Sequence, residues 1–152
     1  MEVVIRPVAA ADSDQLLAWA NEPAVRQYSF IPTPIERADH ERWFANRLHD
    51  KDSLLLLAED ETTHEPAGLI RFMVDEDTAL LSYLLAATHR GRGLAAGLLL
   101  AGVRTLHQQF PEARRVEGQV LAANVASVRA FERAGFIRQE PADESVTFVW
   151  VF

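Results

Sequence analysis

Hydrophobic and polar positions repeat with two different periods along this chain, and each change of period marks a change of element. Runs rich in β-branched and aliphatic residues, bounded by polar or proline-containing turns, predict strands at 3–5, 53–59, 67–74, 78–85, 115–121, 136–139 and 146–152. Segments with apolar residues at helical spacing predict helices at 12–20, 24–27 and 34–48, one of about four turns after Gly93, and one at 124–134.

The ends of these helices carry recognisable signals. Asp12 followed by Gln15 is typical of a capping box, and Thr33-Pro34-Ile35-Glu36 is typical of a helix start. Asn124 stands where an N-cap belongs and Gly135 where a C-cap glycine belongs. The three strands from 53 to 85 are joined by short polar turns, which predicts an antiparallel meander.

The element order β-α-α-β-β-β-α-β-α-β-β predicts a single α+β (mixed α/β) domain over residues 1–152, with helices on both faces of one sheet. At 152 residues, 49% of them hydrophobic, the chain is long enough and apolar enough for one folded core. We therefore expect the chemistry to be built within this one domain.

Composition narrows the function classes. The chain has no cysteine, which excludes a disulfide framework, a thiol nucleophile and cysteine-ligated zinc. Its net charge of −7 argues against a nucleic-acid partner. The histidines show no metal spacing, so we expect no metal. No apolar run approaches the ~18 residues of a membrane span, and the N-terminus lacks a signal-peptide pattern. We expect a cytoplasmic protein without a membrane partner.

A basic, glycine-bearing turn, His89-Arg90-Gly91-Arg92-Gly93, lies between the strand at 78–85 and the helix of four turns. Glycines let backbone N–H groups face one point, and a helix N-terminus adds roughly half a positive charge there. The turn is locally basic within an acidic chain. This arrangement favours a phosphate or pyrophosphate ligand, although an ordinary strand–helix turn would have the same order of elements.

Two well-known phosphate loops do not fit this turn. A Walker A loop requires Lys and Ser/Thr after its last glycine, and Gly93 is followed by Leu94. The dinucleotide fingerprint allows Gly91-Arg92-Gly93-Leu94-Ala95-Ala96, but its acidic partner about 20 residues on would be Glu112, which lies in a turn and not at a strand end.

A third pattern does fit. Arg90-x-x-Gly93-x-Ala95 resembles the R/Q-x-x-G-x-G/A signature of GNAT (Gcn5-related) N-acetyltransferases. A second stretch, from Asn124 through Ser127 and Phe131 to Gly135-Phe136, resembles the N-x-x-[SA]-x-x-x-[YF]-x-x-x-G-F pattern of the same family. Both patterns occur in the family's order and on the expected elements.

The resemblance implies a mixed, mostly antiparallel sheet of six or seven strands, flanked by about four helices, whose two central strands splay apart. It implies acetyl-CoA as co-substrate and an acyltransferase that acetylates a primary amine. The residues that would contact acetyl-CoA by this resemblance are Leu84, Leu85, Ala86, Arg90, Gly91, Arg92, Gly93, Leu94, Ala95, Asn124, Ser127 and Phe131. Asn124 and Ser127 would equally serve as plain helix-cap residues.

The acid and base of the reaction are less clearly marked. Many family members have Tyr where this chain has Phe131, and phenylalanine cannot protonate the leaving thiolate. Tyr83 on the central strand is the candidate acid, although a packed aromatic fits as well. Leu80 occupies the place where relatives often carry a glutamate. Ser82 acting through water and Glu22 are the candidate bases, with His40 as a weaker one and Gln119 as a residue that would position the substrate.

The acceptor is suggested by a finer resemblance in the N-terminal half. The segment Trp19–Arg26 and several later positions resemble GNATs that acetylate amino-sugar nucleotides, as in the pseudaminic acid pathway. The corresponding substrate contacts would be Arg26, Ser29, Phe30, His40, Trp43 and Arg71. Surface ion pairs and core aromatics are the alternative interpretation of these residues.

Two other functions stay open. Acetyltransferases of ribosomal-protein N-termini share parts of the pattern, and a degenerate domain that binds acetyl-CoA without turnover would explain Phe131 and Leu80. The expected partner is a small-molecule amine. The C-terminal segment Phe148–Phe152 either pairs with a second copy in a homodimer or completes its own sheet.

Overall fold

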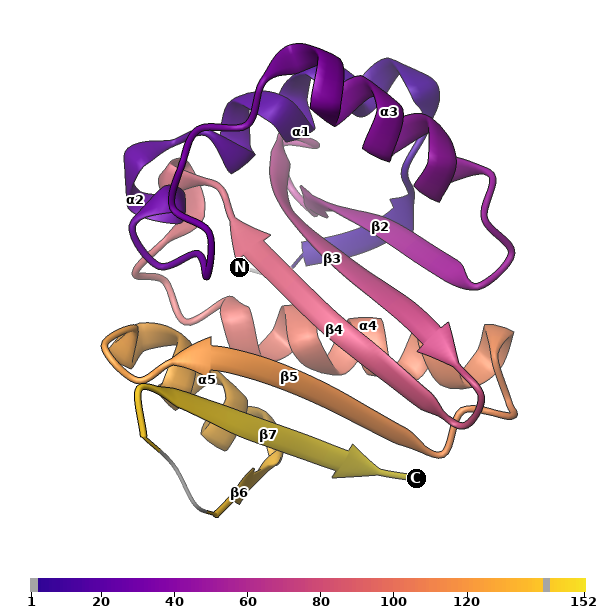
Figure 1. Cartoon of the computed structure of the whole chain (residues 1–152), viewed down its shortest axis with the longest axis vertical. Helices are drawn as coiled ribbons and strands as arrows, with labels where there is room; N and C mark the ends of the chain where they lie inside the picture. The colour runs from indigo at the N-terminus through magenta and orange to yellow at the C-terminus, as the bar shows by residue number, and fades with distance from the viewer. Residues whose placement is uncertain (1–2, 141–142) are drawn as a thin grey trace.

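The computed structural model describes residues 3–140 and 143–152. Its strands form one seven-stranded sheet in the order β1-β2-β3-β4-β5-β7-β6 (Figure 1). The strands are β1 (Val3–Pro7), β2 (Ser53–Asp60), β3 (Pro66–Asp75), β4 (Thr78–Leu85), β5 (Arg115–Leu121), β6 (Ile137–Gln139) and β7 (Ser145–Val151). Among the strand pairs of the described residues, only β4–β5 is parallel. The predicted α+β domain with a mostly antiparallel sheet is confirmed.

Helices cover both faces of this sheet. They are α1 (Ser13–Ala20), α2 (Pro23–Arg26), α3 (Arg37–Leu48), α4 (Ala95–Gln109) and α5 (Val125–Ala134), with short 3₁₀ turns at η1 (Ala10–Asp12) and η2 (Ala87–His89). The helices α1 and α3 lie over β2–β4 on one face, while α4 crosses behind the sheet with α5 beside it (Figure 1). None of the helices in the described ranges is long and apolar enough to cross a membrane.

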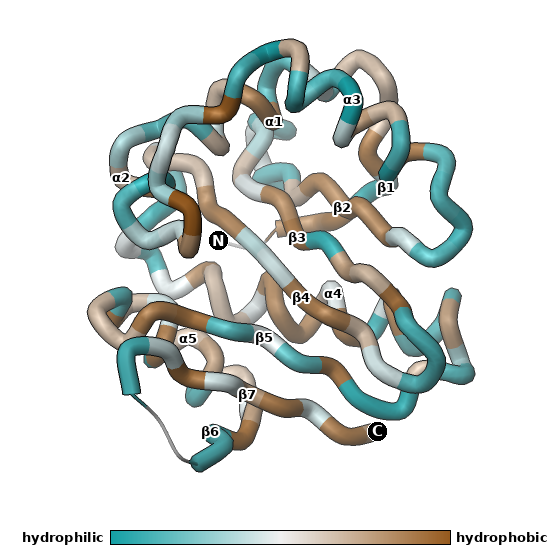
Figure 2. Tube along the Cα trace, in the orientation of Figure 1, coloured by the Kyte–Doolittle hydropathy of each residue, from teal (hydrophilic) through white to brown (hydrophobic). Residues whose placement is uncertain are grey.

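Each helical layer has its own hydrophobic core. Alternate residues of β2, such as Leu54 and Leu56, pack toward α4 and α5, while Leu55 and Leu57 pack toward α1 and α3. The run Leu54–Leu57 is therefore buried on both faces, as its uniform apolarity predicts. Figure 2 shows this as a hydrophobic stretch along β2 beneath a largely hydrophilic α3.

The meander β2-β3-β4 is antiparallel, as predicted, and one of its glycines is required by close strand packing. A Cβ on Gly68 would lie 2.5 Å from the carbonyl oxygen of Leu84 on β4. The β2–β3 register shifts where Ala58 pairs with Gly68 and Glu59 pairs with Pro66. The extra residue on β3 is therefore Ala67, so the predicted bulge lies beside Gly68.

The two central strands separate part-way along their length. The strands β4 and β5 pair from Thr78 with Arg115 as far as Leu81 with Gly118, and the pairing then stops. The rest of β4, Ser82–Leu85, and the rest of β5 form the two arms of a fork. This is the predicted splay.

Two helix starts differ from the prediction. The Asp12 carboxylate makes no capping bond to α1, because it is held by the guanidinium of Arg6 and the backbone N–H of Ala9. The helix α3 begins at Arg37 and not at Pro34, because the side chain of Asn21 hydrogen-bonds both the N–H and the C=O of Ile35. This pair of bonds keeps the chain before α3 out of the helix.

The C-terminal strand completes its own sheet. The strand β7 lies between β5 and β6 and pairs with both in antiparallel register. Its partners are therefore internal along most of its length, and the homodimer stays a prediction.

Candidate active site

The loop from Arg90 to Leu94 joins the end of one fork arm to the N-terminus of α4. Gly91 and Gly93 have φ values of 74° and 73°, a left-handed conformation that favours glycine. The N–H groups of Gly91, Gly93 and Leu94 donate no backbone hydrogen bond to other described residues. They precede the unsatisfied N–H groups of the first helical turn. Alternating backbone conformations of this kind form a concave anion site.

Arg90 fixes this loop in place. Its Nη1 and Nη2 donate to the two carboxylate oxygens of Glu22 at 2.7 and 2.9 Å, and its Nε donates to the carbonyl oxygen of Leu85 at 3.0 Å. The guanidinium thus ties the loop to the end of β4 and to the connection between α1 and α2. Arg92 is exposed on the same loop. Arg90 therefore links the loop to two other segments of the fold, whereas Arg92 lies at the surface.

Glu22, a predicted base candidate, is the acidic partner of Arg90 in this ion pair. Its hydrogen bonds with Arg90 lower the pKa of its carboxyl group, and the charge of Arg90 adds to that effect, against a smaller rise from burial. A carboxylate with a lowered pKa accepts a proton less readily. Its geometry favours a structural role over proton abstraction, and the catalytic assignment stays a prediction.

A buried pair that the sequence did not reveal anchors the start of the loop. His89 Nε2 lies 3.1 Å from Asp60 Oδ2, with both residues almost fully buried. The pKa of Asp60 is lowered by the backbone N–H of Thr62, by His89 and by the N–H of Thr63. Asp60 ends a strand that is 29 positions away in sequence, so no local pattern links it to His89.

Tyr83 lies on the fork arm of β4 and faces α5. Its phenol oxygen is 2.9 Å from Ser127 Oγ, and its ring meets the edge of Phe131 with centroids 5.8 Å apart. Burial raises the pKa of Tyr83, and the hydrogen bond with Ser127 only partly offsets this. The phenol is therefore protonated at neutral pH.

Phe131 itself fills the base of the fork. It stacks on Phe148 and meets Phe136 edge-on, with centroid distances of 5.0 Å in both pairs. Its ring lies against Gly118, the last β5 residue paired with β4: a Cβ there would be 2.7 Å from two ring carbons. Gly118 was not singled out from the sequence, because an isolated strand glycine has no distinctive local pattern.

Ser82 and Tyr83 lie on opposite faces of β4. Ser82 is exposed on the α3 side and pairs in register with Arg71 of β3. Leu80 is exposed on the same side. The candidate acid and the candidate base of the sequence analysis are therefore separated by the sheet backbone at the fork.

The residues predicted to contact substrate divide into two groups. Arg71 lies over the ring of Trp43, with its Cζ 5.0 Å from the ring centroid, and both residues line the α3 side of the sheet. Phe30 is 54% exposed in the connection before α3. These three stay candidates for substrate contact.

The other three residues are engaged within the fold. The Arg26 guanidinium donates to backbone carbonyls, including that of Ala20 at 2.6 Å. Ser29 Oγ donates to the carbonyl of Val25, and His40 Nε2 lies 3.1 Å from Ser13 Oγ in a buried contact between α1 and α3. Their contacts favour structural roles, and their part in binding stays a prediction.

The second motif forms the cap of α5. The Asn124 side chain accepts a hydrogen bond from the N–H of Ser127, and Gly135 ends the helix with φ of 98°. Both predicted ends of the helix are confirmed. In the described ranges, no three His, Asp or Glu side chains gather as ligands for a metal ion.

Comparison with protein-family models identifies the family to which this fold and its glycine loop belong. The acetyltransferase (GNAT) domain model matches residues 2–137. The chain belongs to this GNAT family. Its members are acetyl-CoA-dependent acetyltransferases, so the predicted enzyme class and co-substrate are confirmed with the fold.

Individual relatives of this GNAT domain are distant. An uncharacterized protein of Methanocaldococcus jannaschii is 22% identical over 157 residues, covering 99% of this chain. The chain spans only 31% of that protein's length. A spermidine N-acetyltransferase from Vibrio cholerae, solved with CoA and spermine, has a TM-score of 0.83 at 17% identity, covering 99% of this chain and 95% of its own. An aminoglycoside acetyltransferase solved with coenzyme A and kanamycin has a TM-score of 0.78 at 23% identity and covers the same shares. At such identities these two structures show the fold.

Proposed function

We propose that this GNAT domain acetylates the primary amine of a small molecule, and that an amino sugar carried on a nucleotide is the first acceptor to test. The observation that carries the proposal is the fork itself. The β4–β5 pairing stops at Leu81 and Gly118, and the glycine loop lies at the outer end of the same β4 arm. An anion-binding loop and a free strand edge are thus aligned along β4.

The residues present fit acetyl-CoA. Backbone N–H groups around Gly91 and Gly93 are oriented for a pyrophosphate, and the unpaired edge of Ser82–Leu85 offers backbone groups to an amide-bearing arm. The bound thioester supplies an activated acetyl group. An N–H on this arm would stabilise the negative charge that develops on the carbonyl oxygen during transfer.

Tyr83 is the proposed donor of the proton that the leaving thiolate takes up. The amine nitrogen bonds to the acetyl carbon as the C–S bond breaks, and the leaving thiolate takes one proton. The phenol of Tyr83 is protonated at neutral pH because burial raises its pKa, and we assign it as the donor in place of the hydroxyl that Phe131 lacks. The attacking amine releases its proton to water next to the exposed hydroxyl of Ser82. Water then reprotonates Tyr83.

The experiment is acetyl-CoA-dependent thiol release with purified protein and a panel of acceptors: UDP-linked 4-amino sugars, polyamines and N-terminal peptides. Release with the amino-sugar nucleotides alone supports the proposal in full. Release with peptides alone would replace the small-molecule acceptor with a protein N-terminus. Tight acetyl-CoA binding without release from any acceptor would contradict the proposed transfer and favour a binding domain.

A further inference from the structure

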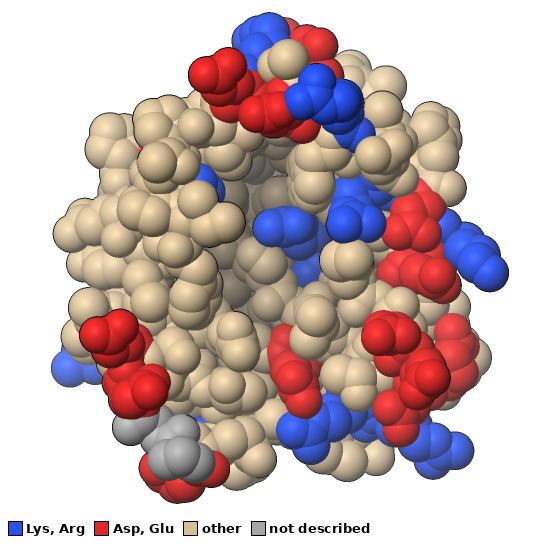
Figure 3. Space-filling view, in the orientation of Figure 1, with Lys and Arg blue, Asp and Glu red and all other residues tan. Residues whose placement is uncertain are grey.

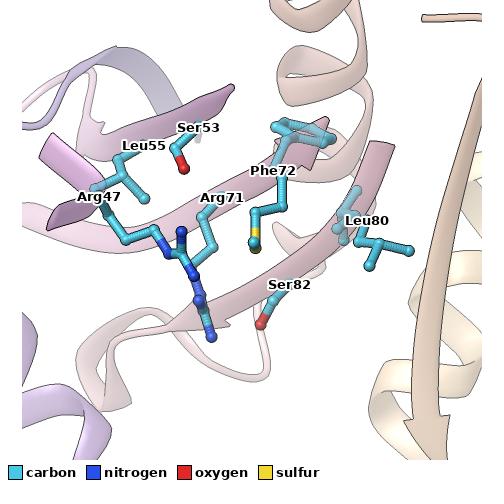
Figure 4. A pocket seen from close by; sticks show the side chains of 9 residues that line it. Arg47, Ser53, Leu55, Arg71, Phe72, Leu80 and Ser82 are labelled. Carbon is cyan, nitrogen blue, oxygen red and sulfur yellow. The ribbon is translucent and has the colours of Figure 1, made fainter. Parts of the chain in front are cut away.

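A pocket of about 190 Å³ opens on the α3 side of the sheet, next to the fork. Figure 4 shows side chains from β2, β3, β4 and α3 converging on it. The residues that matter for the argument are Arg47, Ser53, Leu55, Arg71, Leu80 and Ser82. Ser82 is the first β4 residue beyond the last β4–β5 pair, so the pocket reaches the point where acetyl transfer is proposed.

The pocket contains two arginines and no lining carboxylate. Arg71 makes no ion pair with a residue in the described ranges, and its guanidinium rests on the face of Trp43. Arg47 has one acidic contact, Asp50 at 3.3 Å, and its Nε is buried without a hydrogen-bond partner among the described residues. Figure 4 shows both guanidinium groups extending into the same space.

A third arginine increases the positive charge around Arg71. Arg26 donates its hydrogen bonds to backbone carbonyls, which do not neutralise its charge. Burial lowers the pKa of Arg71 most, and the charges of Arg47 and Arg26 lower it further. In a chain of net charge −7, Figure 3 shows basic side chains gathered at the central hollow of this face. A partly buried cation without a counter-charge, as Arg71 is among the described residues, is costly to keep, and it marks a place where a ligand supplies the opposite charge.

We propose that this pocket is the anion subsite of the acceptor: Arg71 and Arg47 bind a carboxylate or phosphate on the molecule whose amine is acetylated beside Ser82. This assignment rests on the proposed transferase function and names the charge of its acceptor. A planar guanidinium forms two parallel hydrogen bonds with either anion. The contact with the face of the Trp43 ring, 5.0 Å from Cζ to the ring centroid, helps to hold the Arg71 guanidinium in position.

The size of the pocket limits what enters it. Pockets that enclose a whole drug-sized ligand measure ~300–1,000 Å³, and this one is about 190 Å³. It therefore accommodates a small anionic amine, or the anionic end of a larger acceptor such as a sugar nucleotide. Leu55 and Leu80 give it apolar walls, which suit a short carbon segment between the anion and the amine.

The same charges select against polycations. Spermine and kanamycin, which are bound in two structures of similar fold, are cationic at neutral pH. A second cationic group placed beside Arg47 and Arg71 would be repelled. The similar fold thus gives no reason to expect a polyamine or aminoglycoside acceptor for this chain.

The first test compares small primary amines whose other end is anionic, neutral or cationic: 2-aminoethyl phosphate and β-alanine, ethanolamine, and 1,3-diaminopropane. We expect kcat/KM for one or both anionic amines to exceed that for ethanolamine and the diamine by about tenfold or more, as expected for ~1.4 kcal/mol of charge-assisted hydrogen bonding. The two anionic amines distinguish a phosphate site from a carboxylate site. Preference for the diamine would overturn the proposal.

Substitutions of the two pocket arginines test whether the preference for anionic amines arises in this pocket. Arg71→Met and Arg47→Met remove the charge while keeping an unbranched side chain, and each is expected to abolish the preference for the anionic amine. Arg71→Lys keeps the positive charge and should retain part of the preference for the anionic amine. Arg42→Met is the matched control, because Arg42 is exposed on the same helix and pairs with Asp39. A preference that survives Arg71→Met and Arg47→Met would contradict the assignment.

A binding measurement separates this subsite from turnover. Inorganic phosphate and malonate are titrated by calorimetry into protein saturated with CoA, so that the glycine loop is already occupied. We expect at least one of them to bind to the wild type and to the Arg42→Met protein, and to lose affinity at least tenfold in Arg71→Met. If no amine is acetylated but this pattern holds, the transferase proposal fails and the anion site stands. Equal binding to the wild type and to Arg71→Met overturns the anion site.

Discussion

The guanidinium of Arg90 and the carboxylate of Glu22 form a two-point ion pair, with N–O distances of 2.7 and 2.9 Å. They lie 68 positions apart in sequence. Arg90 belongs to the loop that we assign to acetyl-CoA, and Glu22 to the connection between α1 and α2 on the acceptor side. The pair therefore couples the position of the donor loop to that of the connection between α1 and α2.

Replacing Glu22 with Gln should weaken acetyl-CoA binding without contact between Glu22 and the ligand. Both side chains are about a third exposed, so the pair is worth on the order of 1 kcal/mol or less. We expect the KM for acetyl-CoA to rise about fivefold in steady-state kinetics. Glu112→Gln, at an exposed turn after α4, is the control and should change nothing. An unchanged KM for acetyl-CoA in Glu22→Gln would show that the ion pair between Arg90 and Glu22 does not position the loop.

The stabilising effect of Glu22 depends on pH. Arg90 lowers the pKa of Glu22 in the folded state, so the contribution is fully present above the ordinary glutamate pKa of about 4.3. It is lost as the pH falls through the lowered folded value. The difference in urea midpoint between wild type and Glu22→Gln should therefore be constant near neutrality and shrink below about pH 4. A difference that grows on acidification would contradict this linkage.

Tyr83→Phe removes the proposed proton donor and keeps the ring packed on Phe131. General-acid groups contribute roughly 10²–10⁴-fold to rate, and a thiolate leaves fairly readily, so we expect kcat to fall about 100-fold. The KM for acetyl-CoA should change little. Ser127→Ala keeps the phenol and removes its partner, and should cost much less in kcat. Equal losses in the two variants would indicate that the hydrogen bond matters and the phenolic proton does not.

Two glycine substitutions should have opposite effects on stability. At Gly118 a Cβ would lie 2.7 Å from the ring of Phe131, so Gly118→Ala overpacks the base of the fork and should cost about 1–3 kcal/mol of unfolding free energy. At Gly97, an exposed position within α4, nothing lies within 4 Å of the new Cβ. Gly97→Ala should stabilise by about 1 kcal/mol. Urea denaturation checks both, and combining Gly118→Ala with Phe131→Leu should recover part of the loss.

Asp60→Asn tests the anchor of the glycine loop. The carboxylate of Asp60 accepts from the N–H groups of Thr62 and Thr63 and contacts His89. The amide is a poorer acceptor, so we expect a lower Tm and a higher KM for acetyl-CoA. These contacts lower the pKa of Asp60, so its stabilising effect is present above about pH 4 and lost as the pH falls through the lowered value. A Tm difference that persists unchanged at pH 3 would contradict this account.

The sequence by itself determined the order of the elements, the meander, the glycine loop and the cap of α5. These features depend on local physics: the period of apolar residues, the left-handed backbone at Gly91 and Gly135, and the capping side chain of Asn124. The two motifs also sufficed for the family, because they occupy the right elements in the right order. The predicted start of α3 at Pro34 was wrong, because the side chain of Asn21, distant in sequence, hydrogen-bonds the backbone of Ile35.

Tertiary structure decided what each charged side chain does. Arginine has the same local pattern whether it straps a loop, as Arg90 does, caps backbone carbonyls, as Arg26 does, or projects into a pocket, as Arg71 and Arg47 do. Arg47 carried no signal in the sequence at all. Its role depends on the packing of α3 over β2 and β3, which brings together residues far apart in the chain. Charge selection at the acceptor pocket is therefore a property of the folded sheet, because only the fold sets which charges are left without a partner.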